Sequence, residues 1–142
     1  MKAKRGFTLV EILIVVVILG ILAAIVIPQF TEASTEAKTS SLCTDLQTMR
    51  SQIELYKIQH NDELPGAPDG ATFVGDLTGK TDIAGAVAAG PYGPYIQKMP
   101  TNQFNNLDTV DIDGTLGDGD CGWHFNTTTG AFHADDTDHS AL

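Results

Sequence analysis

The stretch RGFTLVEILIVVVILGILAAIVIPQF, residues 5–30, decides the fold of this 142-residue chain. Between Phe7 and Ile27 only Thr8, Glu11 and Gly20 interrupt an aliphatic run. As a helix these residues rise about 31 Å, close to the thickness of the hydrocarbon core of a bilayer. A soluble domain has little use for a helix that is apolar on every side. We therefore predict a transmembrane helix over residues 7–29.

Charge is distributed unevenly on either side of this run. The chain has 8 Lys and Arg against 18 Asp and Glu, a net charge of −10. Lys2, Lys4 and Arg5 precede the run, whereas residues 101–142 contain no Lys or Arg. The positive-inside rule keeps the basic flank cytoplasmic, so the remainder is expected on the far side of the membrane. An acidic head repels phosphate backbones, which argues against nucleic-acid binding.

Three fates of the N-terminus are compatible with a basic flank and an apolar run: a cleaved secretory signal, an uncleaved anchor, or removal of the leader alone. The run is long and no small-x-small site clearly follows it, which disfavours the first. Residues 5–11, RGFTLVE, resemble the class III signal of type IV pilins and type II secretion pseudopilins. The resemblance implies that a membrane peptidase cuts between Gly6 and Phe7 and methylates Phe7. Residues 1–6 are then a cleaved leader.

Glu11 is the one carboxylate inside the apolar run. Placing it in hydrocarbon costs about 2.5–3.5 kcal/mol on insertion scales, so it needs a partner or a task. Cleavage would give Phe7 a free amine, four residues before Glu11. That amine can pair within one chain or with Glu11 of a neighbour, and the family resemblance implies the second arrangement. The alternative is a carboxylate that merely reaches the membrane interface.

Gly20 and Pro28 enclose the second half of the run. Proline removes a helical donor and clashes with the carbonyl of Ala24, and glycine has a low helix propensity. We predict a kink near Pro28 in the free subunit and loss of helix between Gly20 and Pro28 on assembly. An ordinary gentle curve is the alternative.

Beyond Pro28 the sequence becomes polar with an apolar stripe at helical spacing. We expect the helix to run to about His60 and to form the spine of a head, residues 30–142. A dimeric coiled coil is the other interpretation, but only two heptads support it. The stripe consists of Leu42, Leu46, Met49, Ile53 and Tyr56.

The rest of the head predicts an α+β fold of the pilin type. A turn-rich break covers residues 61–68, and a short helix is expected within residues 72–89. Residues 90–106 form a proline-punctuated loop, which partly resembles the corresponding loop of the major pseudopilin. Alternating residues then predict three short strands. We expect a small antiparallel sheet packed on the long helix. Its inner face would be Val110, Ile112, Trp123, Phe125 and Phe132.

Two cysteines and an acidic loop are candidate sites in the head. Cys43 lies beside the apolar stripe and Cys121 near Trp123, so a disulfide is expected outside the cytoplasm, with two buried free thiols as the alternative. No cofactor is required, but aspartates with interleaved glycines can supply oxygen ligands for Ca²⁺. The EF-hand spacing fails, so a solvated acidic turn is the alternative. The candidate ligands are Asp108, Asp111, Asp113, Asp118 and Asp120.

His124, His133 and His139 invite a metal or catalytic interpretation, and the first two are expected to be cross-strand neighbours. No nucleophile motif or phosphate loop accompanies them, so we do not expect an enzyme.

The resemblance implies a prepilin-type filament subunit, most like the major pseudopilin of type II secretion. Its expected partners are prepilin peptidase, the inner-membrane assembly machinery and identical subunits. The subunit would begin in the inner membrane with its head in the periplasm, and the filament would be periplasmic or on the cell surface. A type IV pilin for adhesion, motility or DNA uptake is the first alternative. A membrane-anchored binding module that never polymerises is the second.

Overall fold

The computed structural model describes residues 6–67, 70–87 and 90–142. The chain divides into two compact units, Met1–Ala37 and Lys38–Leu142. The elements follow in the order α1, α2, β1, β2 and β3. The predicted α+β class, a long N-terminal helix with a small C-terminal sheet, is confirmed.

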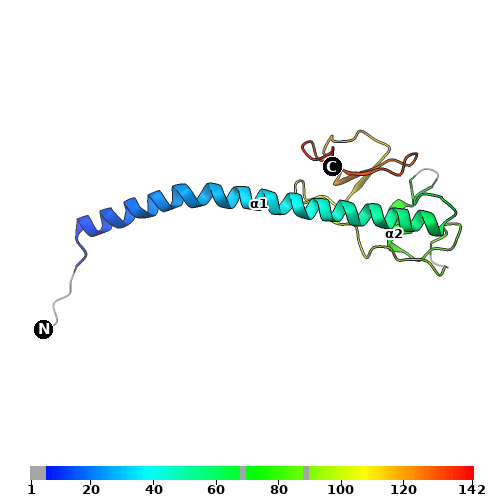
Figure 1. The fold of residues 1–142 in the computed structure, drawn as a ribbon, viewed down its shortest axis with the longest axis horizontal. Coiled ribbons are helices and arrows are strands. Elements are labelled where there is room, and N and C mark those ends of the chain that lie inside the picture. The colour runs from blue at the N-terminus through cyan, green and yellow to red at the C-terminus, as the bar shows by residue number, and fades with distance from the viewer. Residues whose placement is uncertain (1–5, 68–69, 88–89) are drawn as a thin grey trace. The chain divides into compact units, whose positions relative to one another are not determined.

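Helix α1 (Leu9–Gln59) is one uninterrupted helix of 51 residues (Figure 1). Gly20 and Pro28 both lie inside it. Pro28 cannot donate a backbone hydrogen bond, but the helix is continuous around it, and the Thr31 hydroxyl donates to the Ile27 carbonyl at 3.2 Å. The kink near Pro28 and the melting on assembly stay predictions.

The predicted apolar stripe is the buried face of the C-terminal half of α1. Each of its five side chains is at most 2% exposed. The helix ends at Gln59, close to the expected His60. Asn61 and Asp62 then adopt positive φ values of 55° and 67°, a left-handed conformation that turns the chain away from the helix axis.

The sheet consists of β1 (Val110–Ile112), β2 (Trp123–Phe125) and β3 (Phe132–Ala134), in that spatial order. Strands β2 and β3 are antiparallel, as predicted. Strands β1 and β2 are parallel, so the prediction of a wholly antiparallel sheet is wrong for this pair. The physical reason is the connection between them. Residues 113–122 form a returning loop, with positive φ at glycines 117 and 119, instead of a hairpin turn.

The core of the head lies between the α1 stripe and one face of the sheet. Trp123, Phe125 and Phe132 are at most 1% exposed, and the half-buried Val110 and Ile112 pack against the same cluster. The predicted inner face is therefore confirmed. The indole N–H of Trp123 donates to the Pro100 carbonyl at 2.8 Å, so this large side chain is buried without an unpaired donor.

Helix α2 (Phe73–Thr78) is the short helix expected within residues 72–89. It helps to hold the proline-punctuated loop, because the backbone N–H of Tyr95 donates to the Leu77 carbonyl at 2.9 Å. The Tyr95 hydroxyl also donates to Gln59 Oε1 at 2.6 Å, at the end of α1. The loop is thereby tied to both helices.

Candidate functional site

The apolar half of α1 is the most exposed part of the chain. Large aliphatic side chains from Leu9 to Ile27 are between 41% and 82% exposed, and Phe7 is 83% exposed. An 18-residue window of α1 has a mean hydropathy of 3.3 and none of it is buried within the chain. Such a surface is not stable in water, so lipid or other subunits must cover it. The length and composition of the helix are sufficient to cross a membrane.

Glu11 is not isolated, because it forms a capping box with Thr8. The Thr8 backbone N–H and hydroxyl both donate to Glu11 Oε2 at 2.8 Å, and the Thr8 hydroxyl accepts from the Glu11 backbone N–H at 3.3 Å. This reciprocal pattern satisfies free donors at a helix start, where a negative charge is also favourable. The T-x-x-E spacing of residues 8–11 is the sequence signal for this capping box.

The expected cleavage point lies just before α1. Gly6 and Phe7 are exposed and outside any helix or strand, and among the described residues that are not its chain neighbours none lies within 4 Å of a Cβ placed on Gly6. The bond between Gly6 and Phe7 is therefore accessible, and cleavage there stays a prediction. The basic residues Lys2, Lys4 and Arg5 lie outside the described residues.

Comparison with known proteins agrees with these features. Residues 1–27 match the prokaryotic N-terminal methylation motif. The type II secretion system core protein G of Pseudomonas aeruginosa is 32% identical over 117 residues, which are 82% of this chain and 79% of that protein. This chain belongs to the type II secretion system core protein G family. The predicted family resemblance to the major pseudopilin is thereby confirmed.

Two further relatives show how far the similarity extends. The core protein G of Dickeya chrysanthemi is 32% identical over 103 residues, which cover 72% of this chain but only 65% of that protein. A fimbrial protein of Pseudomonas aeruginosa is 41% identical over 54 residues, 38% of this chain. No solved structure matches the chain. The similarity to core protein G thus covers more of the chain than the similarity to the fimbrial protein.

The structure does not join the two cysteines. Cys43 on α1 and Cys121 are both half-buried free thiols. Cys121 lies in a bend two residues before β2. The disulfide stays a prediction, and the mass of the chain with and without reductant measures it.

Two of the five candidate calcium ligands are engaged in hydrogen bonds within the head. Asp113 accepts from the Thr127 backbone at 2.8 Å, and Asp118 accepts from the Asp120 backbone at 3.1 Å. Within the ranges that the structure describes, no group of three or more His, Cys, Asp or Glu side chains is placed to hold a metal ion. The five residues therefore do not form a preformed calcium cage, and calcium binding stays a prediction.

Asp135, which is not among the five candidate ligands, holds the acidic loop in place. Asp135 accepts from the backbone N–H of Gly117 at 2.7 Å and of Cys121 at 3.3 Å. Burial raises the pKa of Asp135, and these two bonds partly offset the effect. The carboxylates of Asp118 and Asp111 raise this pKa further, so negative charge accumulates where the loop meets the sheet.

The expected cross-strand pair of His124 and His133 is confirmed by the register of β2 and β3. His124 is only 6% exposed, so it is a buried polar residue of β2. Burial lowers the pKa of His133, and the nearby Arg50 and His124 lower it further. His139 lies apart from this pair, 2.5 Å from Asp136 and stacked on Phe104.

The depressed pKa of His133 predicts a pH dependence of stability. A histidine whose pKa is lower in the folded protein than its unfolded value of about 6.5 does not reduce the free energy of unfolding above that pH. As the pH falls from there through the folded pKa, the unfolded chain binds the proton first, so stability is lost. We expect the free energy of unfolding to fall below about pH 6.5 more steeply in the wild type than in His133→Asn. Urea denaturation at a series of pH values measures both slopes, and equal slopes contradict the assignment.

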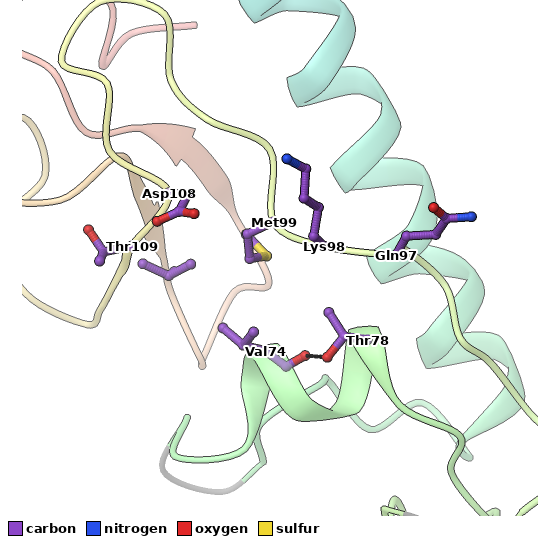
Figure 2. Close-up of a pocket in the computed structure, with 8 residues that line it drawn as sticks. Val74, Thr78, Gln97, Lys98, Met99, Asp108 and Thr109 are labelled. Carbon is purple, nitrogen blue, oxygen red and sulfur yellow. Dashed lines mark hydrogen bonds between the residues drawn. The ribbon is translucent and has the colours of Figure 1, made fainter.

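An open groove of about 540 Å³ lies beside α2 (Figure 2). Val74 and Thr78 form one side, where the Thr78 hydroxyl donates to the Val74 carbonyl at 2.7 Å. Lys98 and Asp108 are its charged members. None of the eight residues that line the groove is Ser, Cys or His, so it lacks a nucleophile with a histidine base.

Proposed function

We propose that this chain is a major pseudopilin, a filament subunit that polymerises through residues 7–29 and thereby drives protein export by a type II secretion system. The observation that supports this proposal most strongly is the apolar N-terminal half of α1. It is exposed on all sides and has a single carboxylate, Glu11, in its first turn. Lipid covers such a helix before assembly, and the same helix of other subunits covers it afterwards. Membership of the core protein G family supports the secretion role.

The proposal assigns steps to individual residues. Prepilin peptidase cuts between Gly6 and Phe7 in the inner membrane and methylates the Phe7 amine. The Glu11 carboxylate of one subunit then pairs with the Phe7 amine of another, which sets their axial stagger. The inner-membrane assembly machinery adds subunits, and the heads lie in the periplasm. The chain carries out no catalysis of its own in this scheme.

A type IV pilin is the second candidate, supported by the fimbrial protein that is similar over 54 residues. That match covers only 38% of this chain, whereas the core protein G match covers 82%. The longer similarity favours the secretion role over a surface fibre.

Electron microscopy of cells that produce the chain with its secretion machinery tests polymerisation. We expect filaments that an antibody against the head labels along their length. A chain that stays dispersed in the membrane under these conditions contradicts the proposal and supports the anchored binding module. The type IV pilin is favoured if the labelled filaments extend beyond the outer membrane and if deletion of the chain causes no defect in protein export.

Calcium binding by the acidic loop is a separate proposal about the head. A cation would offset the repulsion among the carboxylates around Asp135. Calcium at about 100 times its dissociation constant should stabilise the fold by about 2.7 kcal/mol. We expect a higher melting temperature in millimolar calcium, and a smaller rise in Asp118→Asn than in Asp62→Asn, which lies outside the loop. No rise in the wild type contradicts calcium binding.

A further inference from the structure

Three polar side chains form a row across the sheet, on the face opposite the core. Asp111 of β1 is in register with His124 of β2, which is in register with His133 of β3. Residues paired in this way point to the same side of a sheet, and side chains of adjacent strands have Cβ atoms about 4.5–5.5 Å apart. The inner-face residues Trp123, Phe125 and Phe132 alternate with them and fill the core.

Each member of the row has a buried polar atom without a hydrogen-bond partner: Asp111 Oδ2, His124 Nδ1 and His133 Nδ1. In the part of the chain that the structure describes, only one other side-chain atom shares this condition, Asp76 Oδ1. Leaving such an atom unpaired costs about 1–3 kcal/mol. Two of these atoms, His124 Nδ1 and His133 Nδ1, belong to residues in direct cross-strand register, which indicates that a water or an ion pairs with them.

Charged side chains lie on both sides of the histidine pair. Asp111 is next to His124 in the register. Arg50 lies near His133, on the other side of the pair. The form of histidine that binds a metal is the neutral imidazole, which keeps one nitrogen lone pair free.

We propose that His124 and His133 together bind one divalent transition-metal ion, for which Zn²⁺ is the probe. Imidazole nitrogens bind zinc at about 2.0–2.1 Å, so two cross-strand rings can reach one ion. Because no three-ligand cluster is assembled among the described residues, water completes the coordination. The two histidines are not among the candidate calcium ligands, and calcium prefers oxygen ligands, so the zinc site is distinct from the calcium proposal.

Isothermal titration of the full chain in detergent with ZnCl₂ tests the proposal. Excess calcium is present, and both cysteines are replaced by alanine so that thiols do not bind the ion. We expect one zinc per chain, and at least about a tenfold loss of affinity in His124→Asn and in His133→Asn. His139→Asn, the matched control on the same head, is expected to keep wild-type affinity.

Histidine ring NMR signals provide a second readout, in which zinc should shift the signals of His124 and His133 but not those of His139. If His124→Asn does not fold, the half-buried His133 still decides the outcome through its own variant. The proposal is overturned if zinc does not bind, or if affinity is unchanged in His133→Asn. It is also overturned if the zinc-dependent shifts fall on other histidines.

Discussion

Replacement of Glu11 with Gln is expected to abolish filaments while membrane insertion and cleavage after Gly6 continue. Glutamine keeps the size of the side chain and its hydrogen bonds to Thr8, but it cannot neutralise a charged amine. A charge-assisted hydrogen bond contributes roughly 1.5–3 kcal/mol, and every subunit added to the filament would lose it. We therefore expect more than about a tenfold fall in assembled material. Electron microscopy and quantitative immunoblotting of sheared filaments measure it.

Glu32→Gln is the matched control for this experiment. Glu32 is an exposed carboxylate on the same helix, beyond the apolar run, so its loss should leave assembly unchanged. Normal filaments in Glu11→Gln would show that the carboxylate serves only the capping box at the start of α1. Loss of filaments together with loss of cleavage would place the defect before assembly.

Replacement of Phe125 with Ala is expected to destabilise the head by about 3–5 kcal/mol. The Phe125 side chain is fully buried, and its ring centroid lies 4.2 Å from that of Phe73. Removal of the ring leaves a cavity at the junction between the sheet and α2, and a strand of three residues has little other packing to retain it. Thermal or urea denaturation of the detergent-solubilised chain measures the loss.

Ile58→Ala is the comparison for this variant. Ile58 lies on the same helix as the buried stripe but is 75% exposed. Its truncation should change stability by no more than about 0.5 kcal/mol. Equal effects of Phe125→Ala and Ile58→Ala would contradict the position of the core.

The sequence pattern was sufficient to predict the helix stripe and the inner face of the sheet. Both depend on local periodicity, which burial of one face enforces. The sequence pattern was not sufficient to predict the direction of β1 relative to β2. Parallel pairing with β2 depends on the path of residues 113–122, and the distant Asp135 holds that path through Gly117 and Cys121. Local alternation contains no information on such a contact.

The candidate sites likewise include features that the sequence predicts and features that depend on contacts between distant segments. The pairing of His124 with His133 follows from strand register and was predictable, but the burial of His124 was not, because it depends on what lies over that face. The expected role of Asp118 and Asp120 came from composition alone. In the structure these carboxylates do not converge, because short Asx-type hydrogen bonds such as that from the Asp120 N–H to Asp118 satisfy the loop locally.

The central claim is that the basic leader is removed and that the new amine of Phe7 becomes the partner of Glu11. Intact-mass analysis of the chain extracted from membranes, in cells whose prepilin peptidase is active, tests it most directly. The predicted result is a polypeptide that starts at Phe7 and carries one additional methyl group. A polypeptide that still starts at Met1 would contradict the account.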